Sequence, residues 1–464
     1  MRLPPSPPKL PIIGHLHRLG KLPHRSLQAL SEKYGPLMLL RLGQTPTVIV
    51  SSANLAKEIM KTHDVIFANR PITTATKELF NGNKDIAFAP YGEYWRNVRK
   101  IVVMDLLSVK RVQSFRYIRE EEIGKMLEKI RQSSSLGSGV DVSELIVTVT
   151  NNLISRVTLG KSWEVCAKYA DLPKQVMELI GNFSVEDLFP SLGWIDVLTG
   201  LHKKMKRVSK AMSQFLDEVI DEHLKSRKDE DDETRDFVDL LIKYHMDPTL
   251  GCEITRENLR ALIFDLFVGG TDSTSTTTEW ILAELFHHPE VLKKLQNEVR
   301  TAIGTESMVD EDDTNRMEYM HCVIKETLRL HPPLTIIIPR VPTENTTIDG
   351  YHIPAQTRVI INAWAIARDP KIWDNPDQFI PERFINNQVD FRGQDFEFIP
   401  FGAGRRICPG ILFSVTSMAS ILANLLYWFD WDLPNGVESD VTEIFGLTNH
   451  KKDPLRLVPT VHAF

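Results

Sequence analysis

Apolar residues recur at three- and four-residue spacing along most of this chain, which is the period of a helix with one buried face. The pattern predicts helices over residues 26–34, 54–62, 93–107, 112–132, 142–159, 203–227, 256–287, 290–303 and 317–330. Residues 411–429 form a further apolar run without a charged side chain. Because this run contains serine and threonine and ends directly before Asp430, it is predicted to be a buried core helix rather than a membrane span.

Strand-like patterns are short and lie in two parts of the chain. Residues 37–42 and 47–51 form one group, and residues 346–348, 351–353 and 357–361 form the other. The predicted fold class is therefore mainly α with small β-sheets. The proline-rich residues 1–14 are predicted to form a stiff hinge. Residues 15–464 contain no composition break long enough for a linker, so we expect them to form a single domain.

Composition and charge exclude several classes of function. The net charge of −6 is spread over 464 residues without a basic arm, so binding to nucleic acid is not expected. The absence of HExxH, GxSxG, Walker and strand-borne GxGxxG motifs disfavours a hydrolase, an NTPase and a dinucleotide-binding reductase. The spacing of the cysteines excludes a zinc knuckle and a disulfide scaffold and fits a reducing compartment. These cysteines are Cys166, Cys252, Cys322 and Cys408.

Cys408 lies in a loop of sequence FGAGRRICPG, residues 401–410, directly ahead of the long apolar run. Its three glycines permit backbone conformations that a Cβ would forbid, and Pro409 fixes φ, so the loop is predicted to be rigid. Backbone N–H groups directed at the sulfur, with Arg405 and Arg406 nearby, are expected to favour the thiolate over the thiol.

Residues 269–274, with the sequence GGTDST, interrupt the longest helical pattern. Each glycine costs about 1 kcal/mol in a helix interior, and hydroxyl side chains compete for backbone hydrogen bonds. The segment therefore predicts a local kink or widening of the helix.

Two pairs of polar residues lie one helical turn apart. Glu326 and Arg329 place a carboxylate and a guanidinium on the same helical face. Trp95 and Arg99 place an indole N–H and a guanidinium at the spacing of a clamp for a carboxylate.

The pattern Phe401-x-x-Gly404-x-Arg406-x-Cys408-x-Gly410 resembles the haem-binding loop of the cytochrome P450 family, in which the cysteine thiolate is the axial iron ligand. The other motifs follow one another in the order found in that family. The resemblance implies that Cys408 binds the iron of haem b and that the chain has the cytochrome P450 fold.

In that family the glycine-interrupted helix crosses the haem face where dioxygen binds, and its acid and hydroxyl organise water for proton delivery. Asp272 stands at the acid position and Ser273 at the hydroxyl position, where the family usually has threonine. Thr274 is the alternative source of the hydroxyl. Gly269 stands where plant relatives usually have alanine. Because serine lacks the methyl group that stiffens χ1, we expect proton coupling to be less efficient.

The resemblance also assigns roles to the polar pairs. Arg383, in the sequence Pro381-Glu-Arg-Phe384, joins Glu326 and Arg329 in the family's ion-paired core motif, to which we assign a structural role. Haem propionates are bound in the family by tryptophan and arginine side chains, which here are Trp95, Arg99, Arg340 and Arg406.

Residues 363–369, residues 398–407 and the hinge resemble plant A-type members of the 71-like clan most closely. This implies a monooxygenase on the cytosolic face of the endoplasmic reticulum membrane that inserts one oxygen atom from O₂ into an apolar plant metabolite. Electrons from NADPH would arrive through a separate NADPH-cytochrome P450 reductase, with cytochrome b5 as a further candidate partner. Such proteins carry an N-terminal membrane anchor before the hinge, and we expect this chain to lack it.

The resemblance places the substrate pocket among largely apolar segments, which leaves a terpenoid, a coumarin-type phenolic and an alkaloid as open alternatives. The expected walls are residues 72–88, 181–192, 334–338 and 445–448 together with Phe264, Phe267 and Val268. Two other functions remain open: a haem-thiolate enzyme that rearranges hydroperoxides without a reductase, and a haem-thiolate protein without turnover.

Overall fold

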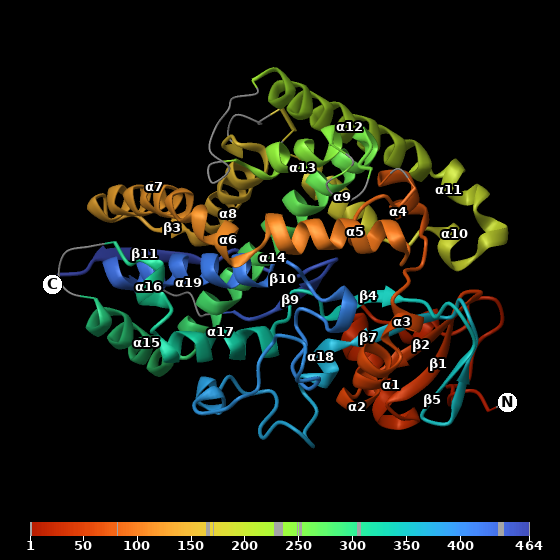
Figure 1. The fold of residues 1–464 in the computed structure, drawn as a ribbon. Helices are drawn as coiled ribbons and strands as arrows, with labels where there is room; N and C mark the ends of the chain where they lie inside the picture. The colour runs from red at the N-terminus through yellow and green to blue at the C-terminus, as the bar shows by residue number, and fades with distance from the viewer. Residues whose placement is uncertain are drawn as a thin grey trace.

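The structure is a computed structural model that describes residues 2–80, 82–163, 168–169, 171–226, 235–247, 249, 253–303, 308–434 and 440–463. Helix α14 (Arg256–His287) runs through the middle of the molecule (Figure 1). Thr255 caps its N-terminus through a reciprocal pair of hydrogen bonds with Asn258. The helices that pack against α14 include α8 (Val142–Leu159), α13 (Phe237–Met246), α17 (Glu318–Leu330) and α19 (Ile411–Trp428).

The remaining helices enclose this core. They are α1 (Pro23–Tyr34), α2 (Ala53–Lys57), α3 (Asp64–Phe67), α4 (Thr74–Leu79), α5 (Glu93–Ile101), α6 (Val109–Ser114), α7 (Arg116–Ser135), α9 (Leu172–Gly181), α10 (Val185–Leu188), α11 (Trp194–Leu198), α12 (Leu201–Lys225), α15 (Pro289–Ala302), α16 (Glu311–Thr314) and α18 (Ala363–Ile366). Short 3-10 turns lie at Leu16–Arg18, Pro190–Leu192, Pro381–Phe384 and Gly404–Arg406.

One mixed four-stranded sheet lies beside α1 and α2 in the order β1 (Leu37–Leu42), β2 (Thr45–Val50), β7 (Arg358–Asn362) and β4 (Ile336–Arg340). Strands β2 and β7 are parallel, and the other pairs are antiparallel. Alternate residues of β2 and β7 enter different apolar clusters: Val48 and Val359 join one, and Ile49 and Ile360 join the other. The sheet is therefore covered on both faces, as the consecutive apolar residues Val359, Ile360 and Ile361 of β7 require.

The other sheets are small. Strand β11 (Arg456–Val461) lies between β3 (Val140–Asp141) and β8 (Phe429–Asp432). Strands β5 (Thr346–Ile348) and β6 (Tyr351–Ile353) form one hairpin, and β9 (Glu443–Phe445) and β10 (Asn449–Lys451) form another. The second hairpin packs against α14 and brings the C-terminal part of the chain to the central helix.

The predicted elements are present, with three differences in detail. The helices predicted at 54–62 and 93–107 change to π-helical hydrogen bonding over Glu58–Thr62 and Val102–Leu106. The helix predicted at 112–132 is two helices, α6 and α7. The widening predicted within 256–287 is absent, because every residue of α14 is α-helical. Instead the hydroxyls of Ser273 and Thr277 donate to the carbonyls of Gly269 and Ser273, one turn earlier.

Helix α19 is a core helix, as predicted. Within the described part of the chain it is the one helix long and apolar enough to cross a membrane, and 67% of it is buried inside the molecule. Its apolar side chains join the largest apolar cluster of the fold.

The N-terminal segment runs along the first sheet. The carbonyl of Pro5 accepts from Leu39 N–H, and the carbonyl of Pro7 bonds the His15 ring at 2.9 Å. Gly14 has a φ of +60°, and a Cβ at this position would lie 2.2 Å from the Arg41 carbonyl oxygen, so the turn into the sheet requires glycine.

Candidate active site around Cys408

The loop that carries Cys408 is held by its own backbone. The N–H of Cys408 donates to the carbonyl of Phe401 (2.9 Å), and the N–H of Ile407 donates to that of Gly404 (3.0 Å). Gly404 has a φ of +69°, and a Cβ there would lie 2.2 Å from the Met60 carbonyl oxygen. The loop can therefore approach the segment after α2 only with glycine at this position.

The thiol of Cys408 lies just ahead of the N-terminus of α19. Burial raises the pKa of this thiol, while the N–H of Gly410 and the positive charge of Arg99 lower it. Arg99 reaches the loop from α5, where its Nη2 donates to the Ile407 carbonyl (2.6 Å). Burial lowers the pKa of Arg99 in turn.

The prediction that Arg405 and Arg406 act on the sulfur is wrong. Arg405 is exposed and lies 3.7 Å from the Asp64 carboxylate. Arg406 points away from the sulfur, and its guanidinium donates to backbone carbonyls. The sequence order of the loop hides this, because consecutive side chains in a tight turn point in different directions.

Three buried arginines, Arg70, Arg340 and Arg406, form what we call the arginine cluster. Burial and then the charges of Arg340 and Arg406 lower the pKa of Arg70 well below its ordinary value. Burial and then Arg340 lower that of Arg406 to about 9. Asp85 lies beside the cluster, and burial raises the pKa of its carboxyl to about 6. The cluster thus holds repelling positive charges that a bound carboxylate ligand would stabilise.

Trp95 meets the arginine cluster at one carbonyl. Its Nε1 donates to Ile86 O (2.9 Å), Arg406 Nη1 donates to the same oxygen (3.1 Å), and the Arg406 guanidinium lies 4.1 Å from the indole centroid. Arg340 donates to Asp64 and to the Ala403 carbonyl, while its buried Nε has no partner within the described residues. The structure thus gathers Trp95, Arg340 and Arg406, and places Arg99 on the Cys408 side.

The two glycines of α14 have different surroundings. A Cβ on Gly270 would lie 2.5 Å from the Ile154 side chain, so α8 can pack this closely only against glycine. A Cβ on Gly269 would have no such neighbour within 4 Å. Ser273, one turn on, faces the same open side and donates to Gly269 O at 2.9 Å.

The two candidate hydroxyls of α14 point to different partners. Thr274 Oγ1 is buried and lies 3.0 Å from Ser414 Oγ, one turn into α19. This contact fixes the glycine-interrupted segment of α14 against the helix that begins at the Cys408 loop. Ser273 remains the more accessible of the two. Asp272 accepts a hydrogen bond from the Thr448 hydroxyl on the β9–β10 hairpin.

The predicted walls of the substrate pocket come together from distant parts of the chain. The ring of Phe80 lies 5.5 Å from that of Phe88 and 5.9 Å from that of Phe264. At the end of α9, a Cβ on Gly181 would lie 3.2 Å from the backbone nitrogen of Leu447. The Phe80 contacts join the segment 72–88 to α14, and the contact of Gly181 with Leu447 brings the segments 181–192 and 445–448 together.

The predicted ion-paired core motif is confirmed. Arg329 bonds both carboxylate oxygens of Glu326 (2.8 and 2.9 Å), and Arg383 Nε bonds Glu326 Oε1 at 3.0 Å. Glu326 and Arg329 are fully buried. Arg329 also donates to the carbonyls of Ala367 and Gln378, which ties α17 to the long segment before the Cys408 loop.

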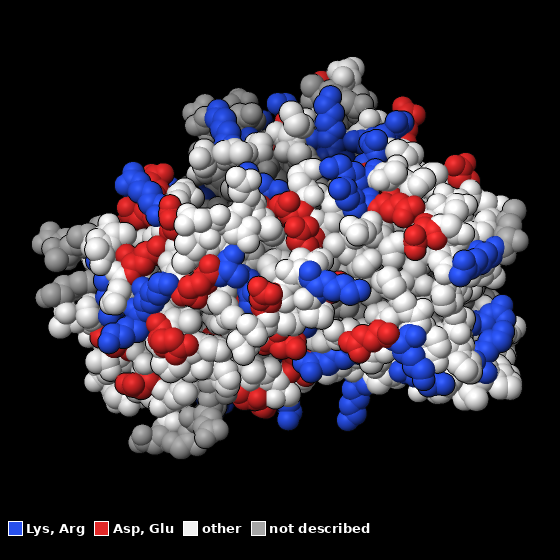
Figure 2. Space-filling model, turned by 90° about the horizontal axis from the view of Figure 1, so that it is seen from below, with Lys and Arg blue, Asp and Glu red and all other residues white. Residues whose placement is uncertain are grey.

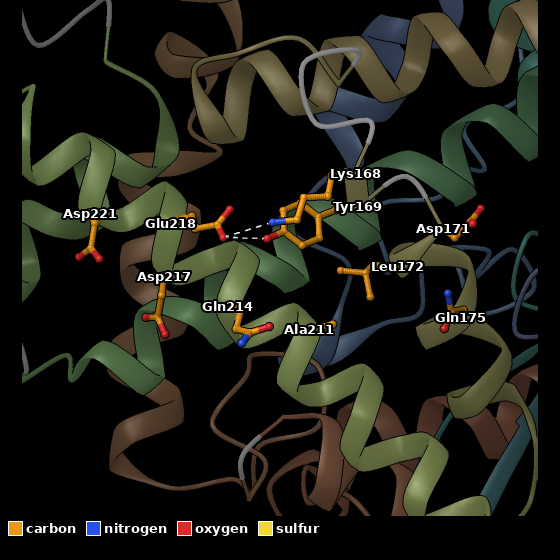
Figure 3. Close-up of a pocket in the computed structure, with 10 residues that line it drawn as sticks. All are labelled: Lys168, Tyr169, Asp171, Leu172, Gln175, Ala211, Gln214, Asp217, Glu218 and Asp221. Atoms are coloured by element: carbon orange, nitrogen blue, oxygen red, sulfur yellow. Dashed lines mark hydrogen bonds and ion pairs between the residues drawn. The ribbon is translucent and has the colours of Figure 1, made fainter.

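A separate cavity of about 700 Å³ lies between α9 and α12 (Figure 3). Its walls combine charged and polar side chains with apolar ones, and Glu218 contacts the Tyr169 hydroxyl (2.9 Å) and Lys168 (3.7 Å). It contains no residue of the Cys408 loop or of α14, so we assign it no part in the chemistry. Its lining residues are Lys168, Tyr169, Asp171, Leu172, Gln175, Ala211, Gln214, Asp217, Glu218 and Asp221.

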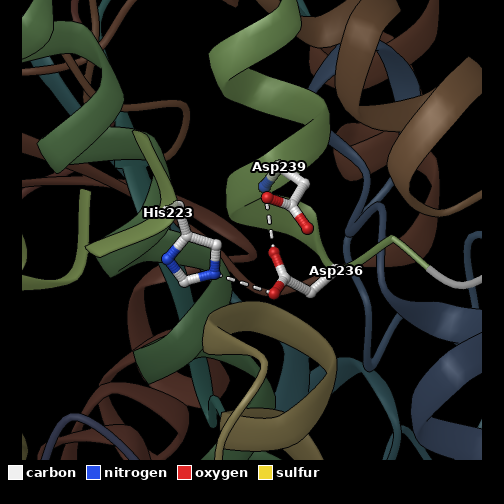
Figure 4. A group of neighbouring side chains, drawn as sticks. All are labelled: His223, Asp236 and Asp239. Carbon is white, nitrogen blue, oxygen red and sulfur yellow. Dashed lines mark hydrogen bonds and ion pairs between the residues drawn. The ribbon is translucent and has the colours of Figure 1, made fainter. Parts of the chain in front are cut away.

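His223, Asp236 and Asp239 form a compact group at the start of α13 (Figure 4). Asp236 caps that helix by accepting from Asp239 N–H, and its second oxygen lies 2.9 Å from His223 Nε2. Burial lowers the pKa of His223, but the hydrogen bond and charge of Asp236 outweigh burial and raise it to about 9. The group is therefore explained as a helix cap joined to α12 by an ion pair.

Comparison with known proteins agrees with this geometry. The family model described as Cytochrome P450 matches residues 4–456. Cytochrome P450 71A1 of Persea americana is 53% identical over 97% of this chain and 91% of its own length. Phenylacetaldehyde oxime monooxygenase CYP71AN24 of Prunus mume is 48% identical over 100% and 90%. A zebra fish cytochrome P450 solved with abiraterone superposes with a TM-score of 0.81 at 27% identity, covering 96% of this chain and 100% of that one.

A mainly α fold in which a cysteine loop precedes a core helix, packed against a long central helix, is the arrangement of a haem-thiolate protein. The chain belongs to the cytochrome P450 family and is similar to its plant 71-type members. Haem is the cofactor that the family implies. The residues fit it: Cys408 supplies a sulfur, the arginine cluster supplies positive charge that Asp64 and Asp85 offset only in part, and Arg340 Nε is a buried donor without a partner in the described structure.

Sequence reasoning missed Arg70 and His450 and placed Asp85 and Thr448 only within the expected pocket walls 72–88 and 445–448. Arg70 and Asp85 belong to the arginine cluster, although neither lies in a motif with a chemical spacing. Thr448 and His450 contact the Asp272 carboxylate from a hairpin more than 170 positions further along the chain. The hairpin and α14 are brought together by the tertiary fold, so no local sequence pattern predicts their contact.

Proposed function

We propose that this protein is a monooxygenase that inserts one oxygen atom from O₂ into an apolar plant metabolite. The observation that carries the proposal is the Thr274–Ser414 contact, which holds the Asp272–Ser273 segment against the helix that begins at the Cys408 loop. Haem bound by Cys408 would supply the activation of dioxygen. The chain itself contributes the sulfur ligand, the positive charge for propionates and an acid and hydroxyl that hold protons.

Each part of the site has a defined task in this proposal. Trp95, Arg99, Arg340 and Arg406 orient the cofactor by binding its carboxylates. Asp272 and Ser273 hold a proton donor and a hydrogen-bonded water on the open side of α14, with Thr274 anchored to α19. The apolar side chains around Phe80 and Phe264 exclude water and hold the substrate by its apolar surface. These walls are compatible with terpenoid, phenolic and alkaloid substrates.

Product formation tests the proposal and separates it from the other haem-thiolate functions. Purified protein with haem is mixed with a plant NADPH-cytochrome P450 reductase, NADPH, O₂ and apolar metabolites chosen by their shift of the haem spectrum. We expect an oxygenated product that requires both NADPH and reductase. Conversion of a hydroperoxide without reductase would point to a rearranging enzyme, and ligand binding without any product would point to a protein without turnover.

Coupling of electron consumption to product is expected to depend on residue 273. Replacing Ser273 by threonine should raise the product formed per NADPH consumed, because the added methyl restricts χ1 and the open side near Gly269 has room for it. Replacing Ser273 by alanine should lower this ratio several-fold, since a tenfold change in partition requires only about 1.4 kcal/mol. Thr274→Ala should matter less. Equal ratios for the wild type and Ser273→Ala would remove Ser273 from the mechanism.

Reductase and cytochrome b5 are proposed to dock on the Cys408 side of the molecule. Arg96, Lys100 and Arg405 are exposed there, on α5 and the loop that approach Cys408. The face seen in Figure 2 intersperses basic and acidic side chains, with no continuous basic field of the kind that binds nucleic acid.

The double reversal Arg96→Glu and Lys100→Glu is expected to raise the KM for reductase by on the order of tenfold at low salt. The difference should shrink as salt increases, because exposed charges are screened. Lys203→Glu, an exposed reversal on α12, is the matched control and should leave this KM unchanged. An unaltered KM in the double variant would contradict docking at this surface.

We also propose that the protein works at the cytosolic face of the endoplasmic reticulum membrane. The support is an exposed apolar surface on α11, where Trp194, Val197 and Leu198 are 58%, 64% and 76% exposed. Aromatic and aliphatic side chains exposed together favour contact with lipid.

A further inference from the structure

A histidine outside the cysteine loop and the central helix approaches the acid of the proposed proton relay. His450 lies on β10, and its Nε2 is 2.7 Å from the hydroxyl oxygen of Thr448 and 3.5 Å from Asp272 Oδ2. The Thr448 hydroxyl in turn donates to Asp272 Oδ2. The other ring nitrogen, Nδ1, is 3.0 Å from Thr276 Oγ1, one helical turn beyond Asp272.

The number of available protons fixes the direction of the hydrogen bonds between His450, Thr448 and Asp272. A hydroxyl has a single proton, and that of Thr448 is given to the Asp272 carboxylate, so the Thr448 oxygen must accept a proton donor from His450. Nε2 of His450 therefore carries a hydrogen. Thr276 holds Nδ1 and so fixes the orientation of the ring.

The two ends of this hydrogen-bond chain are partly exposed, His450 more than Asp272, and its middle is buried. Thr448 is buried, whereas 29% of the Asp272 side chain and 42% of the His450 side chain are exposed. Imidazole is the side chain that most readily takes up and releases protons near neutral pH. A threonine hydroxyl can pass a proton on without itself becoming charged.

We propose that His450 replaces the proton that Asp272 delivers at the oxygen site, by way of the Thr448 hydroxyl. The Nε2–H bond of protonated His450 breaks as a new O–H bond forms on Thr448, while the original Thr448 proton moves to Asp272 Oδ2. Asp272 changes from carboxylate to carboxylic acid, His450 becomes neutral, and Thr448 is unchanged. Once Asp272 has delivered its proton, His450 regains a proton from hydronium in the solvent, and the Thr448 hydroxyl turns back to donate to Asp272. The inference rests on the proposed monooxygenase function and extends its relay by two residues.

Glu279 on α14 and Lys451 on β10 are further charged groups near this histidine. Glu279, two turns beyond Asp272, interacts electrostatically with both His450 and Lys451. Burial raises the pKa of Glu279, and its carboxylate accepts from the Ser143 hydroxyl on α8. The pH dependence of proton transfer is therefore expected to reflect His450, Asp272, Glu279 and Lys451 as a coupled set.

His450→Gln is the informative variant, because the glutamine amide can still donate to Thr448 but cannot exchange a proton. With a substrate that the wild type converts, we expect several-fold less product per NADPH, a larger solvent isotope effect in D₂O and a flatter pH profile. Thr448→Val should behave likewise, and Thr448→Ser should restore coupling. The matched control is His287→Gln, because His287 is an exposed histidine at the end of α14. Wild-type coupling, isotope effect and pH profile in His450→Gln would overturn the proposal.

A spectroscopic readout tests the network without turnover. In the haem-loaded, ferrous carbon monoxide form with ¹⁵N-labelled histidine, the signals lost in His450→Gln identify the His450 ring. We expect Thr448→Val and Asp272→Asn to shift its Nε2 signal, while Lys203→Glu leaves it unchanged. Unshifted signals in both variants would overturn the network. Absence of product in the wild type would instead contradict the proposed monooxygenase function, and the ring signals would still report on the network.

Discussion

Cys408→His is expected to abolish product formation and to remove the red-shifted Soret band of the ferrous carbon monoxide complex. Cys408 is the residue whose sulfur the 401–410 loop presents, with its backbone closed by the Phe401 carbonyl. A histidine ring is bulkier than a thiol and supplies a neutral nitrogen in place of an anionic sulfur, so any iron it held would have different electronic properties. Product is measured with reductase and NADPH, and the band by difference spectroscopy.

The matched control for this substitution is Cys322→Ala. Cys322 is a buried cysteine of α17 whose thiol pKa is raised by burial, so it behaves as a small apolar side chain. This variant should retain both the band and turnover. Persistence of the wild-type band in Cys408→His would show that another residue binds the iron.

Glu326→Gln is expected to cost about 3–5 kcal/mol of unfolding free energy, because it leaves the fully buried Arg329 without its anionic partner. Arg383 and the N–H of Ile380 also bond Glu326 Oε1, so the substitution weakens several contacts at once. Denaturant titration of the haem-loaded protein measures the change.

Glu120→Gln removes one acid from an exposed pair and is the control for loss of negative charge. Its partner Arg116 keeps Asp310 and Asp312, and exposed ion pairs contribute only about 0–1 kcal/mol. Similar stabilities for the two variants would mean that the Glu326 network does not hold the segment before the Cys408 loop.

Helix periodicity and local motifs were sufficient to predict most of the fold. The long helices and the early strands follow from apolar spacing that one segment carries by itself. The Glu326–Arg329 pair was predictable because both residues share one helical turn, and its link to Arg383 followed from the family motif. The strands that were missed are β3, β4, β8, β9, β10 and β11. The two longest of these contain a proline, Pro339 in β4 and Pro459 in β11, and the others have two to four residues, too few for a clear alternation.

The directions of side chains in loops could not be predicted from the sequence. Arg405 and Arg406 are neighbours in the chain, yet one faces solvent and the other is buried against Trp95. The Asp272–His450 contact joins two elements whose pairing depends on the whole fold. The family resemblance had already grouped Arg340 with Arg406, but only the fold shows that Arg70 and Asp85 lie beside them.

The carbon monoxide difference spectrum of the wild-type protein, reduced with dithionite after haem loading, tests the central claim most directly. Coordination of the iron by the Cys408 thiolate predicts the red-shifted Soret band that thiolate ligation produces. A haem-loaded wild-type protein whose ferrous carbon monoxide complex lacks that band would contradict the assignment of Cys408 and the function built on it.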